Sequence, residues 1–360
     1  MPSGTSRRDS LTRSRDDYVI GWISALPIES AAAVMMLDEE HSNLSNADGD
    51  SNIYKLGKIG AHNVVMACVN EAGGTPTSIV ATNLMRSFRN VRYILMVGVG
   101  GGIPSSEYQI RLGDVVVSEP TGKYPGVVQS DFGKWEEDGF DIMGSLNRPA
   151  AGLIRAIGVM KREQLLDRSK IHRFVRHLEG GISAGGIWAY PGREKDPGYR
   201  GGIRLRRSHS CRIGRLRQDL EVHDPNPKVH YGIIASGNQV IKNREERNKL
   251  SSQLGACCVE MEAFGLMNNF PCLVIRGISD YADGHKSDRW QGYASLTAAA
   301  YAKELLIWIP PLDMESTPKM GQQMEQINRR LDKIEGKMHE LEQDRSGKII
   351  AYLFGTSAKC

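Results

Sequence analysis

Short apolar segments alternate with helix-like stretches along most of the chain. The strand-like segments include YVIGWISAL, NVVMACV, RYILMVGV, DVVVSE, HYGIIASGN and PCLVIRGISD, and the helix-like ones include SIVATNLMRSF and ASLTAAAYAKELLIWI. Strands rich in β-branched residues that alternate with helices predict a layered α/β domain. Pro310 and Pro311 end the last helix and begin a linker. We therefore predict one α/β domain over residues 18–310.

Two segments depart from this pattern. Residues 1–17 are mostly Ser, Arg and Asp with almost nothing apolar, which predicts a disordered tail. The stretch 165–225 is rich in Gly and Arg, and residues 161–220 hold 15 Lys or Arg against 6 Asp or Glu. This composition favours a solvated insert over an RNA-binding or anion-binding patch, because the segment lacks the regular interleaving of aromatic residues with cations that single-strand binding requires. Nucleic acid is therefore not expected as a partner.

A third pattern follows the linker, where apolar residues recur at alternating steps of three and four. These residues are Met324, Ile327, Leu331, Ile334, Met338 and Leu341. The spacing is that of a heptad repeat and predicts a short coiled coil over residues 320–345, followed by a tail over residues 346–360. We expect a homo-oligomer that uses this helix in addition to the α/β domain. A single amphipathic helix lying on the domain is the alternative.

Composition excludes several classes of protein. Of the 360 residues, 40% are apolar and 24% charged, which rules out a fully disordered chain. No apolar run approaches the ~20 residues of a membrane span, so no membrane is expected as a partner. The six cysteines show no CxxC spacing, and the amino terminus lacks a secretory signal, which predicts a cytoplasmic protein with reduced thiols. No His pair has the spacing of metal ligands, and we expect no metal.

Candidate chemistry gathers where strands end, which is where open α/β sheets place their sites. The first strand ends near Leu26, and Glu29 falls in the first turn of the helix that begins at Pro27. Amides at a helix start stabilise a carboxylate, which suits a base. Taken alone, Glu29 is better explained as an ordinary acid of a first helical turn.

Glycines end the strand RYILMVGVGGGIP. Gly98 and Gly100 fit the start of a GxGxxG motif, but Ile103 occupies its last glycine position. The run is therefore not a dinucleotide-binding fingerprint. It predicts exposed amides and a close approach of the backbone to a ligand.

Acidic residues end two later strands. Glu260 and Glu262 flank Met261, and two acids two positions apart on an extended stretch share a face, which suits binding of a vicinal diol. Ser279 and Asp280 end the strand LVIRGIS, where partial desolvation favours a protonated carboxyl group and so a general acid. The alternative for Asp280 is an Asx turn or helix cap.

Six segments, in this order, resemble the purine nucleoside phosphorylase and uridine phosphorylase superfamily. They are VIGWISALPIE, MVGVGGGIP, LGDVVVSEP, HYGIIASGN, VEMEAFGLM and LVIRGISDYAD. The resemblance covers about residues 17–160 and 228–309. It is strongest to the nucleosidases that cleave methylthioadenosine and S-adenosylhomocysteine, and among them to fungal domains fused to signalling or repeat modules. The resemblance implies a three-layer α/β/α fold around a mixed, partly closed sheet, with cleavage of an N-glycosidic bond as the reaction.

The resemblance also implies roles for individual residues. Asp280 would protonate the purine at N7, with Ser279 in support. Glu262 would hold the ribose hydroxyls, and Met261 would pack under the sugar. Glu29 would position the attacking water.

Three departures from the family pattern stand out. Val99 replaces the usual Ser or Thr after the first glycine, and Val240 stands where a purine-stacking aromatic is common. The stretch 175–225, where the family has strands and a substrate loop, keeps only YPGREKD as a familiar island.

The choice of nucleophile separates hydrolysis from phosphorolysis. A phosphorylase binds a phosphate dianion, normally with arginines in two places that here are Glu29 and Met96. We therefore expect hydrolysis of purine nucleosides without a cofactor. Arg86, Arg89 and Arg92 keep phosphorolysis, with phosphate as co-substrate, as the alternative. A non-catalytic nucleoside-binding module that oligomerises is the other alternative.

Overall fold

One mixed sheet of ten strands organises the structure, a computed structural model that describes residues 13–137, 139–181, 186–197, 226–311 and 319. The strand order is β11 (Ala256–Glu260), β10 (Val229–Ser236), β6 (Val115–Ser118), β12 (Leu273–Asp280), β5 (Tyr93–Gly102), β1 (Ile20–Ser24), β4 (His62–Cys68), β3 (Tyr54–Ile59) and β2 (Glu39–His41), and β7 (Val127–Gln129) pairs with β10. Strands β1, β4, β5 and β12 form a parallel centre, and β6 joins β12 in antiparallel fashion.

The sheet closes partly on itself because β11 also pairs with β5. Cys258 lies opposite Gly102 and Val259 opposite Gly101 in this antiparallel contact. The glycines of β5 permit the approach, since a Cβ added at Gly100 would lie only 2.7 Å from the Cys258 Sγ. The predicted mixed, partly closed sheet is thus confirmed.

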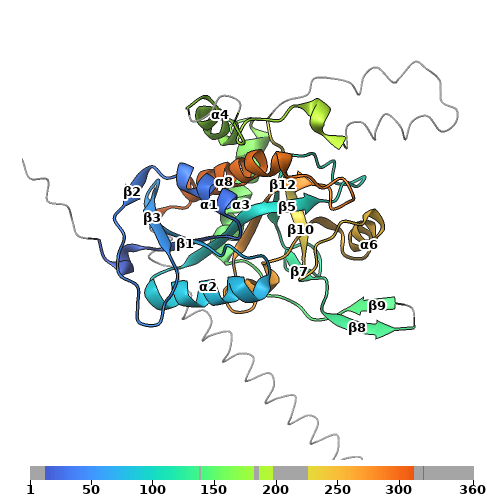
Figure 1. Cartoon of the computed structure of the whole chain (residues 1–360), viewed down its shortest axis with the longest axis horizontal. Coiled ribbons are helices and arrows are strands. Elements are labelled where there is room, and N and C mark those ends of the chain that lie inside the picture. Colours follow the sequence, from blue (N-terminus) through green and yellow to red (C-terminus); the bar gives the residue numbers. More distant parts are fainter. Residues whose placement is uncertain (1–12, 138, 182–185, 198–225, 312–318, 320–360) are drawn as a thin grey trace, which may run out of the picture. The chain divides into compact units, whose positions relative to one another are not determined.

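Helices cover both faces of the sheet, as Figure 1 shows. They are α1 (Pro27–Met35), α2 (Gly74–Ser87), α3 (Ala151–Leu165), α4 (Ile171–Gly181), α6 (Arg244–Leu254), α7 (Phe264–Met267) and α8 (Gln291–Ile307). Helices α1, α3, α4 and α8 lie on one side, and α2 lies on the other. Helix α8 is almost wholly buried against β12 and β5. Its alanines allow this, because the backbone of Ala294 lies directly against Gly277. The three-layer prediction is confirmed.

Three short 3-10 helices and one hairpin complete the described elements. The 3-10 helices are η1 (Arg15–Asp17), η2 (Arg193–Lys195) and η4 (Asp288–Trp290), and the hairpin consists of β8 (Gly133–Glu136) and β9 (Gly139–Ile142). The hairpin strands pair with each other and stand apart from the main sheet (Figure 1).

The boundaries predicted for irregular segments need two corrections. The predicted disordered tail is wrong for residues 13–17, because η1 is tied to the domain: the Asn90 side chain donates to the Asp16 carbonyl at 2.7 Å. The atypical stretch begins later than residue 165, since α4 extends to Gly181. Residues 1–12, 182–185 and 198–225 lie outside the described residues, and so do the heptad at 320–345 and the tail that follows it.

Candidate active site

A cavity of about 630 Å³ opens beside the ends of β11 and β12. Its lining includes nine of the ten candidate site residues from the sequence analysis, namely Glu29, Val99, Gly100, Val240, Glu260, Met261, Glu262, Ser279 and Asp280. The hairpin β8–β9 and helix α6 form its outer wall. Segments from five parts of the chain therefore meet at one site, because strand ends converge at one edge of the sheet.

Glu29 is buried at the start of α1, and both of its carboxylate oxygens accept hydrogen bonds. Its Oε2 accepts from the amides of Ala25 and Leu26, each at 2.8 Å, and its Oε1 accepts from the amide of Val99 at 2.7 Å. Burial raises the pKa of Glu29, while Arg276 and these amides oppose the rise. The amides near the helix start thus contact the Glu29 carboxylate, while burial acts against them on its pKa.

Gly98 is the one proposed residue that does not line the cavity. A Cβ added there would lie 2.6 Å from the Arg276 Nη1 and would also meet the Glu29 carboxylate. The glycine thus leaves room for Glu29 and Arg276 to lie side by side. The amides that the glycine run was expected to offer to a ligand include that of Val99, which is bonded to Glu29.

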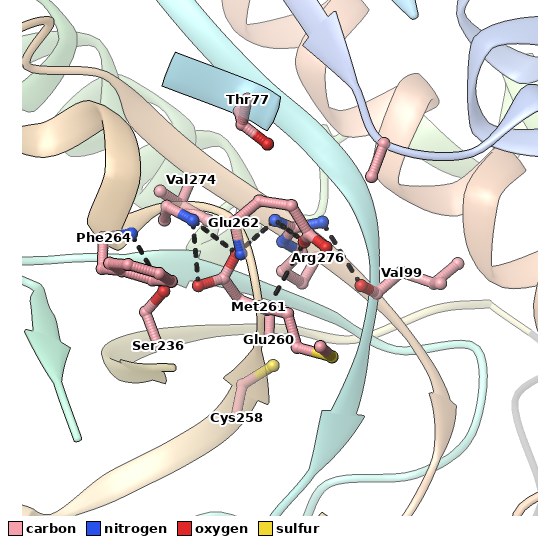
Figure 2. Close-up of polar contacts among 12 residues, drawn as sticks. Thr77, Val99, Ser236, Cys258, Glu260, Met261, Glu262, Phe264, Val274 and Arg276 are labelled. Atoms are coloured by element: carbon pink, nitrogen blue, oxygen red, sulfur yellow. Dashed lines mark hydrogen bonds and ion pairs between the residues drawn. The ribbon is translucent and has the colours of Figure 1, made fainter. Parts of the chain in front are cut away.

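Arg276 lies at the centre of the buried charges and is fully inaccessible to solvent. Figure 2 shows its guanidinium between Glu260, Glu262 and the Val99 carbonyl. Its Nη2 contacts the Glu260 Oε2 and donates to the Glu262 Oε2 at 3.0 Å. We did not single out Arg276 from the sequence. The available signal was a cation inside the apolar strand LVIRGISD, since a buried charge requires a partner.

Glu260 and Glu262, which we expected to bind a vicinal diol together, have different surroundings. The Glu260 carboxylate contacts Arg276 and accepts from the amides of Glu262 and Ala263, at 3.1 and 3.0 Å, so its oxygens are engaged within the protein. The Glu262 Oε1 has one long contact, 3.4 Å from the Gly73 amide. Burial raises the pKa of Glu262 to about 7, against the opposing effect of Arg276. Glu262 is therefore the acid with acceptor capacity for a ligand.

Asp280 ends β12 with its carboxyl group at the cavity. Its Oδ1 accepts from the Ala282 amide at 2.8 Å, and its Oδ2 accepts from the Ser279 hydroxyl at 3.1 Å. The ammonium group of Lys286 lies 3.5 Å from the same Oδ2. Asp283 instead accepts from the His285 amide at 2.9 Å, which is the contact of an Asx turn.

Comparisons with known proteins agree with this architecture. A family model described as the phosphorylase superfamily matches residues 186–306. A 5'-methylthioadenosine/S-adenosylhomocysteine nucleosidase of Mycobacterium bovis is 26% identical over 299 residues, which are 81% of this chain and 97% of that protein. Over residues 186–306 the chain is thus similar to the phosphorylase superfamily.

Two further comparisons concern the fold and a longer relative. The solved structure of futalosine hydrolase of Helicobacter pylori shares the fold with a TM-score of 0.53 at 18% identity, over 81% of this chain and 99% of that one. A nucleotide-binding leucine-rich repeat (NLR)-like protein of Hyaloscypha variabilis is 44% identical over 306 residues, or 85% of this chain. The chain spans only 30% of the length of that relative.

The cations that kept phosphorolysis as the alternative lie away from the cavity lining. None of Arg86, Arg89 and Arg92 lines the cavity, and Arg86 donates to the Gly49 carbonyl at 2.9 Å. The described lining contains no arginine. It does contain three lysines, Lys242, Lys249 and Lys286.

Neither a cluster of metal-binding side chains nor a membrane-spanning helix occurs among the described residues. No group of three or more His, Cys, Asp or Glu side chains in that part of the chain is arranged to hold a metal ion. No helix in the same part is long and apolar enough to cross a membrane.

Proposed function

We propose that this chain hydrolyses the N-glycosidic bond of purine nucleosides with water as the nucleophile. The observation that carries the proposal is the presence of Glu29, Glu262 and Asp280 on one cavity whose described lining holds no arginine. A carboxylate beside the sugar repels a phosphate dianion but accepts a proton from water. The cavity volume of about 630 Å³ is within the range of small-molecule sites.

In the proposed reaction the bond between C1' of the ribose and N9 of the purine breaks. Asp280 donates its proton to N7, so that the base leaves as a neutral molecule. Glu29 orients the water that attacks C1' and accepts its proton. General acid catalysis of this kind contributes on the order of 10² to 10⁴ in rate.

Two groups support this chemistry from the protein side. Glu262 accepts hydrogen bonds from the ribose hydroxyls, and the guanidinium of Arg276, 3.0 Å away, holds its carboxylate in place. Met261, which lines the cavity between the two acids, packs against the sugar. The raised pKa of Glu29 supports its use as a base, because a base is most effective when its pKa lies nearer the working pH.

Purine specificity follows from the position of the acid. Uracil has no atom that corresponds to N7, so a carboxyl group aimed at that atom cannot activate it. We expect faster cleavage of adenosine, inosine or methylthioadenosine than of uridine. Val240, which is 53% exposed at the cavity, offers the base an aliphatic contact in place of a ring.

The experiment is an incubation of the full chain with these four nucleosides, each with and without phosphate, followed by detection of free base and sugar. The expected products are the purine base and free ribose, or its 5' derivative, at rates independent of phosphate. Ribose 1-phosphate as the main product would establish phosphorolysis instead. Nucleoside binding without release of base would establish the non-catalytic alternative.

A further inference from the structure

Tyr281, the residue after Asp280, is held at both ends by buried polar groups. Its hydroxyl donates to both carboxylate oxygens of Asp196, at 2.9 and 3.0 Å. Its carbonyl accepts from the Arg247 Nη1 at 2.8 Å. All three side chains are buried, with exposed fractions of 4 to 8%. The three residues belong to different parts of the chain: the segment after η2, helix α6 and the end of β12.

The backbone that follows Tyr281 has an unfavourable conformation. Ala282 has a φ of +50°, and the other non-glycine residues with positive φ among those described are Asn70 and Asp167. Asn and Asp tolerate the left-handed region, whereas alanine gains nothing from its side chain there. Such a conformation persists only where the surroundings hold it. The hydrogen bonds of the neighbouring Tyr281 to Asp196 and Arg247 restrain the backbone next to Ala282.

This conformation aims a hydrogen bond at the proposed general acid. The Ala282 amide donates to the Asp280 Oδ1 at 2.8 Å. Both carboxylate oxygens of Asp280 are therefore held by hydrogen bonds, Oδ1 by this amide and Oδ2 by the Ser279 hydroxyl. A shift of the peptide between Tyr281 and Ala282 would change the orientation of the carboxyl group.

The Tyr281 hydroxyl is suited to act as a permanent donor in this arrangement. Burial and the neighbouring Asp196 raise the pKa of Tyr281, so the phenol stays protonated at neutral pH. The contact also connects Asp280 to YPGREKD, the island that remained familiar in the sequence. Asp196 lies 85 positions before Tyr281 along the chain.

We propose that Tyr281 is a positioning residue for Asp280, acting through the Ala282 amide, and that Asp196 and Arg247 hold it in place. The inference rests on the proposed function, because it gives Asp280 the role of general acid. Tyr281 does not donate or accept a proton in the reaction. Its effect is therefore expected in turnover and not in substrate affinity.

The test compares Tyr281→Phe, which removes only the hydroxyl, with Tyr301→Phe. Tyr301 is a matched control, because it is also fully buried and its hydroxyl lies 3.5 Å from that of Tyr231, away from the cavity lining. Release of adenine from methylthioadenosine gives kcat and KM, and thermal unfolding gives the Tm. We expect Tyr281→Phe to lower kcat about ten- to hundredfold with KM within about twofold, since small misplacements of catalytic groups have effects of this size. Tyr301→Phe should leave both constants unchanged.

A second pair of variants separates the hydrogen bond from packing. Asp196→Ala removes both acceptor oxygens and should lower kcat as Tyr281→Phe does. Asp196→Asn keeps one acceptor and should recover most of the loss. Equal loss of kcat in the two Asp196 variants would contradict the role of this hydrogen bond.

The outcomes distinguish the inference from the function on which it rests. If the wild type releases base, Asp280→Asn does not, and Tyr281→Phe keeps the wild-type kcat, the inference is wrong and the function stands. Equal losses of kcat in Tyr281→Phe and Tyr301→Phe would show that the loss comes from lower stability of the protein, and this result would also overturn the inference. A wild type that releases no base overturns both.

Discussion

Replacing Arg276 by Met tests the buried charge cluster directly. Arg276 has no exposed surface, and its guanidinium contacts Glu260, Glu262 and the Val99 carbonyl. Methionine fills a similar linear space in the core but brings no charge and no donor. The variant therefore leaves the carboxyl groups of Glu29, Glu260 and Glu262 buried together without a cation.

The expected cost follows from the number of carboxylates that lose their partner. Removing one member of a buried ion pair costs about 3–5 kcal/mol, because the remaining charge is left desolvated. Arg276 serves two carboxylates directly, which places the loss in the free energy of unfolding toward the upper end of that range at pH 8. Protonation relieves the cost. Carboxyl groups whose pKa is raised in the folded state contribute stability at low pH that is lost as the pH rises through the raised value.

The assay is urea unfolding followed by tryptophan fluorescence at pH 5.5 and pH 8. We expect Arg276→Met to lose about 3–5 kcal/mol at pH 8 and clearly less at pH 5.5. Arg276→Lys keeps the charge and should lose less at pH 8. The double variant Arg276→Met with Glu260→Gln should recover part of the loss, since it removes one uncompensated charge.

Two results would refute this reasoning. One is a wild-type free energy of unfolding for Arg276→Met at pH 8, which would mean that the carboxylates need no cation. The other is an equal loss at both pH values together with no recovery in the double variant. That result would assign the effect to packing alone.

Three further predictions concern the acid, the pH dependence and the carboxyl-terminal segment. Asp280→Asn should lower the rate of base release on the order of 10² to 10⁴ while calorimetry still detects nucleoside binding; turnover near that of the wild type would contradict the general-acid role. Because burial raises the pKa of Glu262 to about 7 from an ordinary 4.5, its contribution to stability is present below about pH 4.5 and is lost as the pH rises through 7. Glu262→Gln should therefore flatten the fall in the free energy of unfolding between pH 5 and 8, and an unchanged slope would show that other groups cause it. Ending the chain at Asp313 removes the predicted coiled coil at 320–345 and should lower the mass measured by light scattering at high protein concentration. Identical masses for the full and shortened chains across a dilution series would show that the heptad takes no part in oligomerisation.

The local pattern of the chain determined the fold class and singled out acidic residues that line the cavity. Alternating strands and helices predicted the layered α/β structure, and polar residues at strand ends predicted Glu29, Glu262 and Asp280. The fold prediction is confirmed because side-chain periodicity is a local property, and the three acids line one cavity because the carboxyl ends of parallel strands meet at one edge of a sheet.

Tertiary structure alone decided which polar groups are paired and which remain available. Glu260 and Glu262 have the same side chain and neighbouring positions, yet Glu260 is engaged by Arg276 and two amides while Glu262 keeps acceptor capacity. The contact of Tyr281 with Asp196 joins residues 85 positions apart, and β11 closes on β5 across an even larger gap in the sequence, from Gly102 to Cys258. Such pairings depend on how whole strands and helices pack, and burial then sets the pKa of each carboxyl group. No spacing within one segment carries that information, because the partner of each buried charge lies on another element.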